Sequence, residues 1–262
     1  MRSYKDVFSE NDRAALIPFF VLGDPDQERS LELIKTAIDA GADILELGIP
    51  FSDPIADGPT IQKADIRALE NGITCDGAFE IIRQIKEYRD IPIGLLMYYN
   101  LICHYGKENF YRDAAAAGVN SVLVADLCVD DAEEVRELVE KNKLESVYMV
   151  TPNTSAERKK RIAELCTGFI YTVAVLGVTG ARVELGESIV PLIHSLKKLT
   201  EVPVCVGFGV SKPEHAQQLA KAGADGVIVG SAVVNIIEKN LTAADYGKTE
   251  LAEFIRNMRV VL

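Results

Sequence analysis

The sequence predicts a closed (β/α)8 barrel, in which parallel strands alternate with helices around one core. Three observations predict this fold: eight short apolar runs follow one another along the 262 residues, helical patterns separate them, and glycine-rich turns follow the last two runs. We expect residues 1–262 to form a single domain, because such barrels routinely reach about 250 residues without dividing.

The predicted strands are β-branched, apolar runs, most of which close on Gly, Asp or Thr. They span Ile17–Gly23, Asp43–Gly48, Pro92–Tyr98, Ser121–Asp126, Ser146–Thr151, Gly168–Val173, Val202–Gly207 and Gly226–Gly230. Between them, apolar residues recur at helical spacing, as at Leu31, Ile34 and Ile38. Each such helix would bury one face, so the chain alternates strand and helix throughout.

Three junctions between a helix and the next strand repeat one pattern, an Ala-Gly pair followed by a small or β-branched residue and Asp or Asn. These are Ala40–Asp43, Ala117–Asn120 and Ala222–Asp225. Glycine fits the left-handed position just past a helix end, so the same turn is reused. An open, doubly wound sheet would show the same alternation. Eight units, no Gly-x-Gly-x-x-Gly after the first strand and the late glycine turns favour the barrel.

Composition excludes several classes of function. The formal net charge is −11, so no basic surface is expected for nucleic acid. No segment offers the roughly 20 apolar residues that span a bilayer, and the five scattered cysteines are typical of free thiols in a reducing compartment. We therefore expect a cytoplasmic protein. The three histidines are far apart, and no metal is expected.

The turns after the last two predicted strands are typical of a phosphate site. Residues 206–211 read Val-Gly-Phe-Gly-Val-Ser, and residues 229–232 read Val-Gly-Ser-Ala, where Ser231 would open a short helix. Glycine lets backbone amides approach an anion, and a helix N-terminus adds partial positive charge. We therefore predict that Gly209, Gly230 and Ser231 bind phosphate. Flavin mononucleotide barrels use the same corner, so the pattern does not identify which phosphate.

Glu46 is a carboxylate within an otherwise apolar strand. Its neighbours Leu45 and Leu47 must point to the opposite face, and we expect these leucines, with Ile44, to pack outward against helices. Glu46 would then point into the barrel, where a raised pKa would suit a general acid or base. A structural ion pair is the alternative. In the following loop, Asp53 and Asp57 each lie near a proline, and composition does not decide which of them acts.

These residues resemble the tryptophan synthase alpha chain family. The resemblance runs from about Pro18 to Ile237, and its most specific part is the Pro-Phe-Ser-Asp-Pro-x-Ala-Asp-Gly-Pro stretch within residues 45–62. Shorter matches are Leu22–Pro25, Leu96–Tyr98, Gly177–Gly180, Gly207–Gly209 and Gly230–Ser231.

The resemblance implies a lyase that cleaves indole-3-glycerol phosphate to indole and glyceraldehyde 3-phosphate, and passes indole to a β chain in an α2β2 tetramer. It implies that Glu46 protonates C3 of the indole ring and that Asp57 hydrogen-bonds the indole N–H. The other residues it assigns to the site bind substrate: Phe19, Leu96, Tyr171, Thr179, Gly180, Phe208, Gly209, Gly230 and Ser231. No cofactor is implied.

Three positions depart from the family pattern, and none of them removes a catalytic group. Ala174 lies where many members have Ser, Val21 lies where Thr is common, and Cys128 replaces a usual proline. Cys128 falls in a loop that, by resemblance, contacts the β chain, so coupling between subunits is put in doubt.

Three alternatives remain open. The first is a stand-alone lyase that releases free indole. The second is a sugar-phosphate isomerase or a flavin barrel with the same phosphate corner. The third is a silent regulatory subunit, which the presence of both Glu46 and Asp57 argues against.

Overall fold

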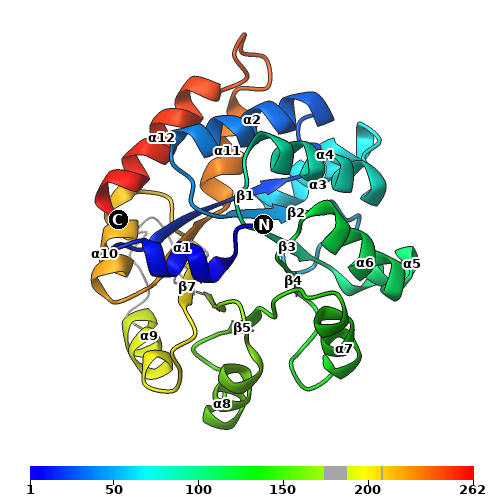
Figure 1. Cartoon of the computed structure of the whole chain (residues 1–262). Helices are drawn as coiled ribbons and strands as arrows, with labels where there is room; N and C mark the ends of the chain where they lie inside the picture. Colours follow the sequence, from blue (N-terminus) through cyan, green and yellow to red (C-terminus); the bar gives the residue numbers. More distant parts are fainter. Residues whose placement is uncertain (174–187, 208) are drawn as a thin grey trace.

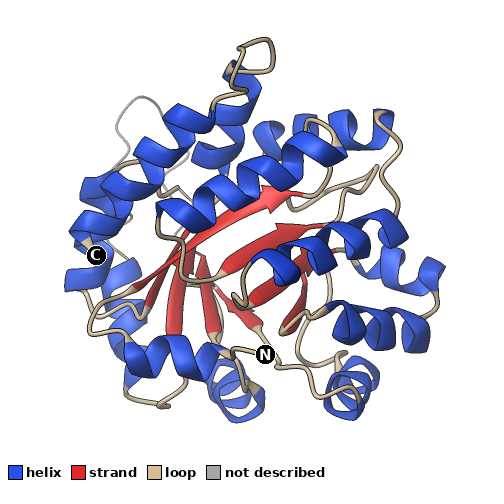
Figure 2. Ribbon diagram, turned by 45° about the horizontal axis from the view of Figure 1, so that its top comes forward, coloured by secondary structure: helices blue, strands red, loops and turns tan. Residues whose placement is uncertain are grey.

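The computed structural model describes residues 1–173, 188–207 and 209–262. Eight parallel strands form one sheet in the order β4-β3-β2-β1-β8-β7-β6-β5, and the helices surround it (Figures 1 and 2). The strands are β1 (Ala15–Val21), β2 (Leu45–Gly48), β3 (Ile93–Met97), β4 (Ser121–Val124), β5 (Tyr148–Val150), β6 (Ile170–Val173), β7 (Val204–Gly207) and β8 (Gly226–Val229). The predicted barrel is therefore confirmed, and each predicted strand contains most or all of an observed one.

The helices lie between the strands as the apolar periodicity predicts. They are α1 (Tyr4–Glu10), α2 (Gln27–Ala40), α3 (Pro59–Glu70), α4 (Cys75–Tyr88), α5 (Tyr99–Tyr105), α6 (Lys107–Ala117), α7 (Glu133–Lys141), α8 (Ala156–Leu165), α9 (Ile189–Lys197), α10 (Pro213–Lys221), α11 (Ser231–Lys239) and α12 (Lys248–Val261). At the three repeated junctions, Gly41, Gly118 and Gly223 have φ values of 116°, 95° and 90°. This is the left-handed conformation that the Ala-Gly pattern predicts.

Closure of the barrel is nearly complete. Strand β1 pairs with β2 on one side and with β8 on the other, while Ser121 of β4 forms a single bridge to Glu145, which precedes β5. Helix α1 covers the amino-terminal end of the strands, where buried Tyr4 contacts the ring of Phe169 and hydrogen-bonds Ser121 at 2.7 Å. Helix α1 and the ring of Tyr4 therefore cover the barrel interior at this end.

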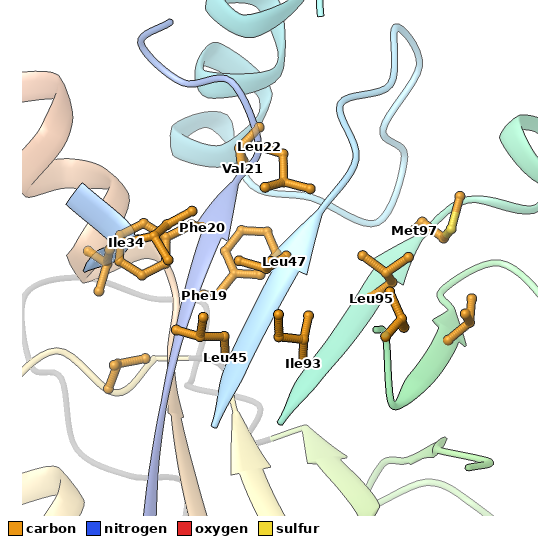
Figure 3. Packing of buried hydrophobic residues seen from close by; sticks show 14 of the residues in the cluster. Phe19, Phe20, Val21, Leu22, Ile34, Leu45, Leu47, Ile93, Leu95 and Met97 are labelled. Atoms are coloured by element: carbon orange, nitrogen blue, oxygen red, sulfur yellow. The ribbon is translucent and has the colours of Figure 1, made fainter. Parts of the chain in front are cut away.

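Two hydrophobic clusters lie on opposite faces of the sheet. The outer cluster contains Leu45 and Leu47 of β2, which lie beside Ile93 and Leu95 of β3 under the helices (Figure 3). The inner cluster includes Ile44 together with side chains from several other strands. The expectation for Ile44 was therefore wrong. Alternation along a strand places residue 44 on the same face as residue 46, so both face the barrel interior.

A buried ion pair fixes helix α3 against the end of β1. Arg67 of α3 donates two hydrogen bonds to Asp24, at 2.7 and 2.9 Å, and Asp24 is 1% exposed. Burial raises the pKa of Asp24, and the Arg67 guanidinium opposes that rise. Because α3 directly follows the loop that carries Asp57, this pair helps to set where that loop ends.

We predict that Arg67→Met lowers the free energy of unfolding by about 3 kcal/mol, because it leaves the buried Asp24 carboxylate without its partner. Urea unfolding at pH 7 measures the change. The matched control is Arg83→Met, since Arg83 pairs with Glu80 on the exposed face of α4 and its loss should cost less than about 0.5 kcal/mol. Equal effects of the two substitutions would show that the Asp24–Arg67 pair does not stabilise the fold.

Candidate active site

A cavity of about 280 Å³ opens at the carboxyl end of the barrel, where the loops and helix N-termini meet. Its described lining combines acidic, aromatic and glycine residues: Phe19, Glu46, Asp57, Ile61, Leu96, Tyr171, Gly209, Val210, Ser211, Ile228, Gly230, Ser231, Ala232 and Asn235. Eight of the eleven residues that the sequence assigned to the site are in this set. The other three, Thr179, Gly180 and Phe208, lie outside the described residues, as does Ala174.

Glu46 reaches the cavity from the middle of β2. It lies in register with Phe19 of β1 and Gly94 of β3, and it is only 4% exposed. Burial raises the pKa of its carboxyl group to about 8, and the negative charge of Asp57 adds to the rise. At neutral pH, Glu46 therefore holds its proton and can donate it to a ligand in the cavity.

Asp57 reaches the same cavity from the loop that joins β2 to α3. The hydroxyl of Tyr98 donates a hydrogen bond to its Oδ2 at 2.6 Å and accepts one from the amide of Ala56 at 3.0 Å. Burial raises the pKa of Asp57, while the bond from Tyr98 opposes the rise. Asp53, the other acid of this loop, is exposed and accepts a hydrogen bond from Ser52. The geometry thus separates the two aspartates, which composition had left open.

The opposite end of the cavity is formed by backbone. Helix α11 begins at Ser231, and Gly230 precedes it as the N-cap without a side-chain cap, so the first amides of the helix are not occupied by a capping side chain. Gly209, with a φ of 79°, lies on the other side of this end. Amides and a helix N-terminus without a cation form the type of site that binds phosphate.

Tyr171 closes the floor of the cavity from β6. It is buried, and the burial raises the pKa of its hydroxyl above the ordinary value, with the charge of Glu46 as the next contribution. Gly207 lies directly beside its ring, and a side chain at that position would collide with the Tyr171 hydroxyl. The ring of Tyr171 therefore requires glycine at this position.

Sequence reasoning missed three described residues at or near this site: Tyr98, Asn235 and Asp65. Tyr98 was recognised only as part of a motif, although a polar residue at the end of a barrel strand is itself a signal. Asp65 is a carboxylate on the buried face of α3, in line with Ile61 and Ala68, and such an interruption of an apolar face could have identified it.

Two further observations concern the described part of the chain alone. It contains no group of three or more His, Cys, Asp or Glu side chains arranged to hold a metal ion. None of its helices is both long enough and apolar enough to span a bilayer.

The fold and the cavity together define a class: a (β/α)8-barrel enzyme with acid–base side chains at one end of its pocket and a phosphate-type helix N-terminus at the other. The family model described as "Tryptophan synthase alpha chain" matches residues 6–262. This chain belongs to that family.

Curated relatives and solved structures agree with the family model. The alpha chain of Methanothermobacter thermautotrophicus is 51% identical over 239 residues, covering 91% of this chain and 88% of that one. The alpha chain of Methanoregula boonei is 45% identical over 259 residues, covering 99% and 98%. A structure of the tryptophan synthase a2b2 complex from Pyrococcus furiosus superposes with a TM-score of 0.88 at 41% identity, covering 95% and 98%. For Mycobacterium tuberculosis tryptophan synthase the TM-score is 0.89 at 32% identity, covering 100% and 98%.

The raised pKa of Glu46 predicts a dependence of stability on pH. Its pKa is about 8 in the folded chain, against 4.5 in its unperturbed state, so folding favours the protonated form. Glu46 therefore costs no stability below about pH 4.5 and costs progressively more as the pH rises toward 8. We expect Glu46→Gln to be more stable than the parent chain by about 2 kcal/mol or more at pH 8, with little difference at pH 5.

Urea unfolding at both pH values measures this difference. Glu253→Gln, on the exposed face of α12, is the control and should show no such trend. A pH-independent difference for Glu46→Gln would mean that the Glu46 carboxyl group ionises as a solvated one does.

Proposed function

We propose that Glu46 and Asp57 carry out the alpha reaction in this chain. The chain is the alpha-reaction lyase of tryptophan synthase, which cleaves indole-3-glycerol phosphate to indole and glyceraldehyde 3-phosphate. The observation that supports the proposal is the shared cavity, which has Glu46 and Asp57 at one end and the N-terminus of α11 at the other. A substrate with an indole ring and a phosphate needs both ends.

Glu46 supplies the proton in the first step. It protonates C3 of the indole ring, and the ring becomes an indoleninium cation. The positive charge develops at the ring nitrogen, where Asp57 accepts the N–H and stabilises the cation electrostatically. Because the Tyr98 hydroxyl holds Oδ2 of Asp57, the carboxylate keeps one orientation toward the ring.

The second step breaks the carbon–carbon bond. The glycerol hydroxyl next to C3 loses its proton to the Glu46 carboxylate, and its O–H electrons form the aldehyde C=O. The electrons of the C–C bond return to the ring and neutralise the indoleninium, which leaves indole. Glu46 ends the cycle protonated, so one residue alternates between acid and base and no further proton carrier is required.

The substrate-binding residues are proposed from the same cavity and from the family resemblance. The amides of Gly209, Gly230 and Ser231 bind the phosphate. Phe19, Leu96 and Tyr171 enclose the indole and glycerol groups. Thr179, Gly180 and Phe208 complete the set by resemblance alone: Gly180 and Phe208 add a phosphate amide and a pocket wall, and Thr179 hydrogen-bonds Asp57 when the lid loop closes.

The chain acts as the α subunit and passes indole to a β chain, with which it forms an α2β2 tetramer. The Pyrococcus furiosus relative was solved as an a2b2 complex whose subunits activate each other, which supports this assignment over a stand-alone lyase. We also propose that residues 1–262 are one domain and that the protein is cytoplasmic, since its five cysteines form no disulfide pair.

We predict that Glu46→Gln lowers kcat for indole release at least about 100-fold, because glutamine cannot donate the proton. Asp57→Asn should lower kcat by a similar factor because it removes the charge opposite the ring nitrogen. Both variants should bind glycerol 3-phosphate, measured by calorimetry, within about threefold of the parent. Near-normal turnover by Glu46→Gln would rule out Glu46 as the acid. Glu253→Gln serves as the control for charge removal.

We predict that the purified chain releases indole slowly from indole-3-glycerol phosphate and that an added β chain accelerates release at least about tenfold. Oxidation of the released glyceraldehyde 3-phosphate by an NAD-dependent dehydrogenase measures turnover, because the substrate and free indole share the same ring and do not differ enough in fluorescence. Fast release that the β chain does not change would identify a stand-alone lyase instead.

A further inference from the structure

Asp65 is a second buried acid that the proposed chemistry does not use. It lies on α3, its side chain is on the buried face of the helix, and the residue is only 5% exposed. Arg67, two residues further along, gives its hydrogen bonds to Asp24. A buried carboxyl group needs a hydrogen-bonding role to offset its desolvation, so its partners identify what it does.

The partner of Asp65 is the loop that carries Asp57. The Asp65 carboxyl group accepts a hydrogen bond from the backbone N–H of Phe51, near the start of that loop. The ring of Phe51 packs on the ring of Tyr98 with centroids 5.2 Å apart, and Tyr98 holds Asp57. A continuous chain of contacts therefore runs from Asp65 through Phe51 and Tyr98 to the carboxylate of Asp57.

We propose that Asp65 is a positioning residue for the alpha reaction: by accepting the Phe51 amide it fixes the β2–α3 loop, and with it Tyr98 and Asp57, beneath the indole ring. This inference rests on the role proposed for Asp57. It concerns orientation, since Asp65 is not among the described residues that line the cavity.

The charges around Asp65 require that it act as a neutral acid. It faces Asp57 from the loop and Asp24 from the end of β1, and its charge is also felt by Tyr98 from the end of β3. Burial raises the pKa of Asp65 to about 8, and Asp57 adds to the rise. The pKa of Glu46 is also raised to about 8, by burial and by the charge of Asp57. Near pH 7, Glu46 and Asp65 therefore hold their protons, while the hydrogen bond from the Tyr98 hydroxyl favours the charged form of Asp57.

Two substitutions separate hydrogen bonding from charge. Asp65→Asn keeps an acceptor for the Phe51 amide and should retain kcat at pH 7 within about threefold of the parent. Asp65→Leu removes the acceptor at similar volume and should lower kcat at least about tenfold, while affinity for glycerol 3-phosphate changes less than about threefold. Glu70→Gln, on the exposed side of the same helix, is the matched control and should change neither quantity.

A pH series tests whether Asp65 is held as a neutral acid, and the loss of kcat at unchanged affinity for glycerol 3-phosphate separates positioning from a purely structural role. The folded chain favours protonated Asp65, so its ionisation destabilises the fold increasingly from about pH 4 up to about pH 8. The Tm of Asp65→Asn minus that of the parent should therefore grow between pH 5.5 and pH 8.5. The same difference for Glu70→Gln should stay constant.

Several outcomes would overturn the proposal. They are an unchanged kcat in Asp65→Leu, an equal loss of kcat in Asp65→Asn and Asp65→Leu, and a Tm difference for Asp65→Asn that does not depend on pH. If Asp65→Leu does not fold, Asp65→Ser takes its place, because serine is too short to reach the Phe51 amide. Failure of the Asp57 role is distinguishable, since it would appear as near-normal turnover in Asp57→Asn, which no result at position 65 affects.

Discussion

The structure depends on one constraint: the carboxyl group of Glu46 must remain in the apolar interior of the barrel, in a cavity whose described lining includes no lysine or arginine. Glu46 meets this constraint by holding its proton, because β2 places it among buried side chains and beside the charge of Asp57. An arginine or lysine in contact with Glu46 would lower its pKa and make it a carboxylate, unable to donate at neutral pH. In the proposed binding mode the phosphate accepts hydrogen bonds from backbone amides at the N-terminus of α11, and none of the described residues that line the cavity is a lysine or an arginine.

The barrel fold brings the acid and the helix N-terminus into one cavity although they belong to separate elements. Parallel strands bring all their carboxyl ends to one rim, so an acid on β2 and a helix that follows β8 open into the same space although Glu46 and Ser231 lie far apart in the sequence. The other rim is covered by α1, and the ring of Tyr4 is buried in the inner cluster. Stability and chemistry conflict at Glu46, since the desolvation that raises its pKa also destabilises the folded chain as the pH rises.

Much of this arrangement could be predicted from the sequence, for reasons that individual residues make clear. Strand periodicity placed Glu46 inside the barrel because Leu45 and Leu47 must face away from it, and the same rule corrects the expectation for Ile44. Repeated Ala-Gly pairs identified the helix ends, because only the left-handed conformation at Gly41 and Gly118 explains them. Contacts made across the fold could not be predicted: no local pattern relates Tyr98 to Asp57 or Asp65 to Phe51, since each pair joins separate elements.

The acids Glu46, Asp57 and Asp65 form a graded set rather than three equal groups. Glu46 and Asp65 are the more deeply buried, and burial together with the charge of Asp57 raises the pKa of each to about 8, so both hold their protons at neutral pH. Charging a second member would place two carboxylates in one low-dielectric region and separate the elements that hold them. On the proposed roles, the proton on Asp65 affects catalysis without contact with the substrate, because it avoids a second negative charge beside Asp57, the carboxylate assigned to the indole nitrogen.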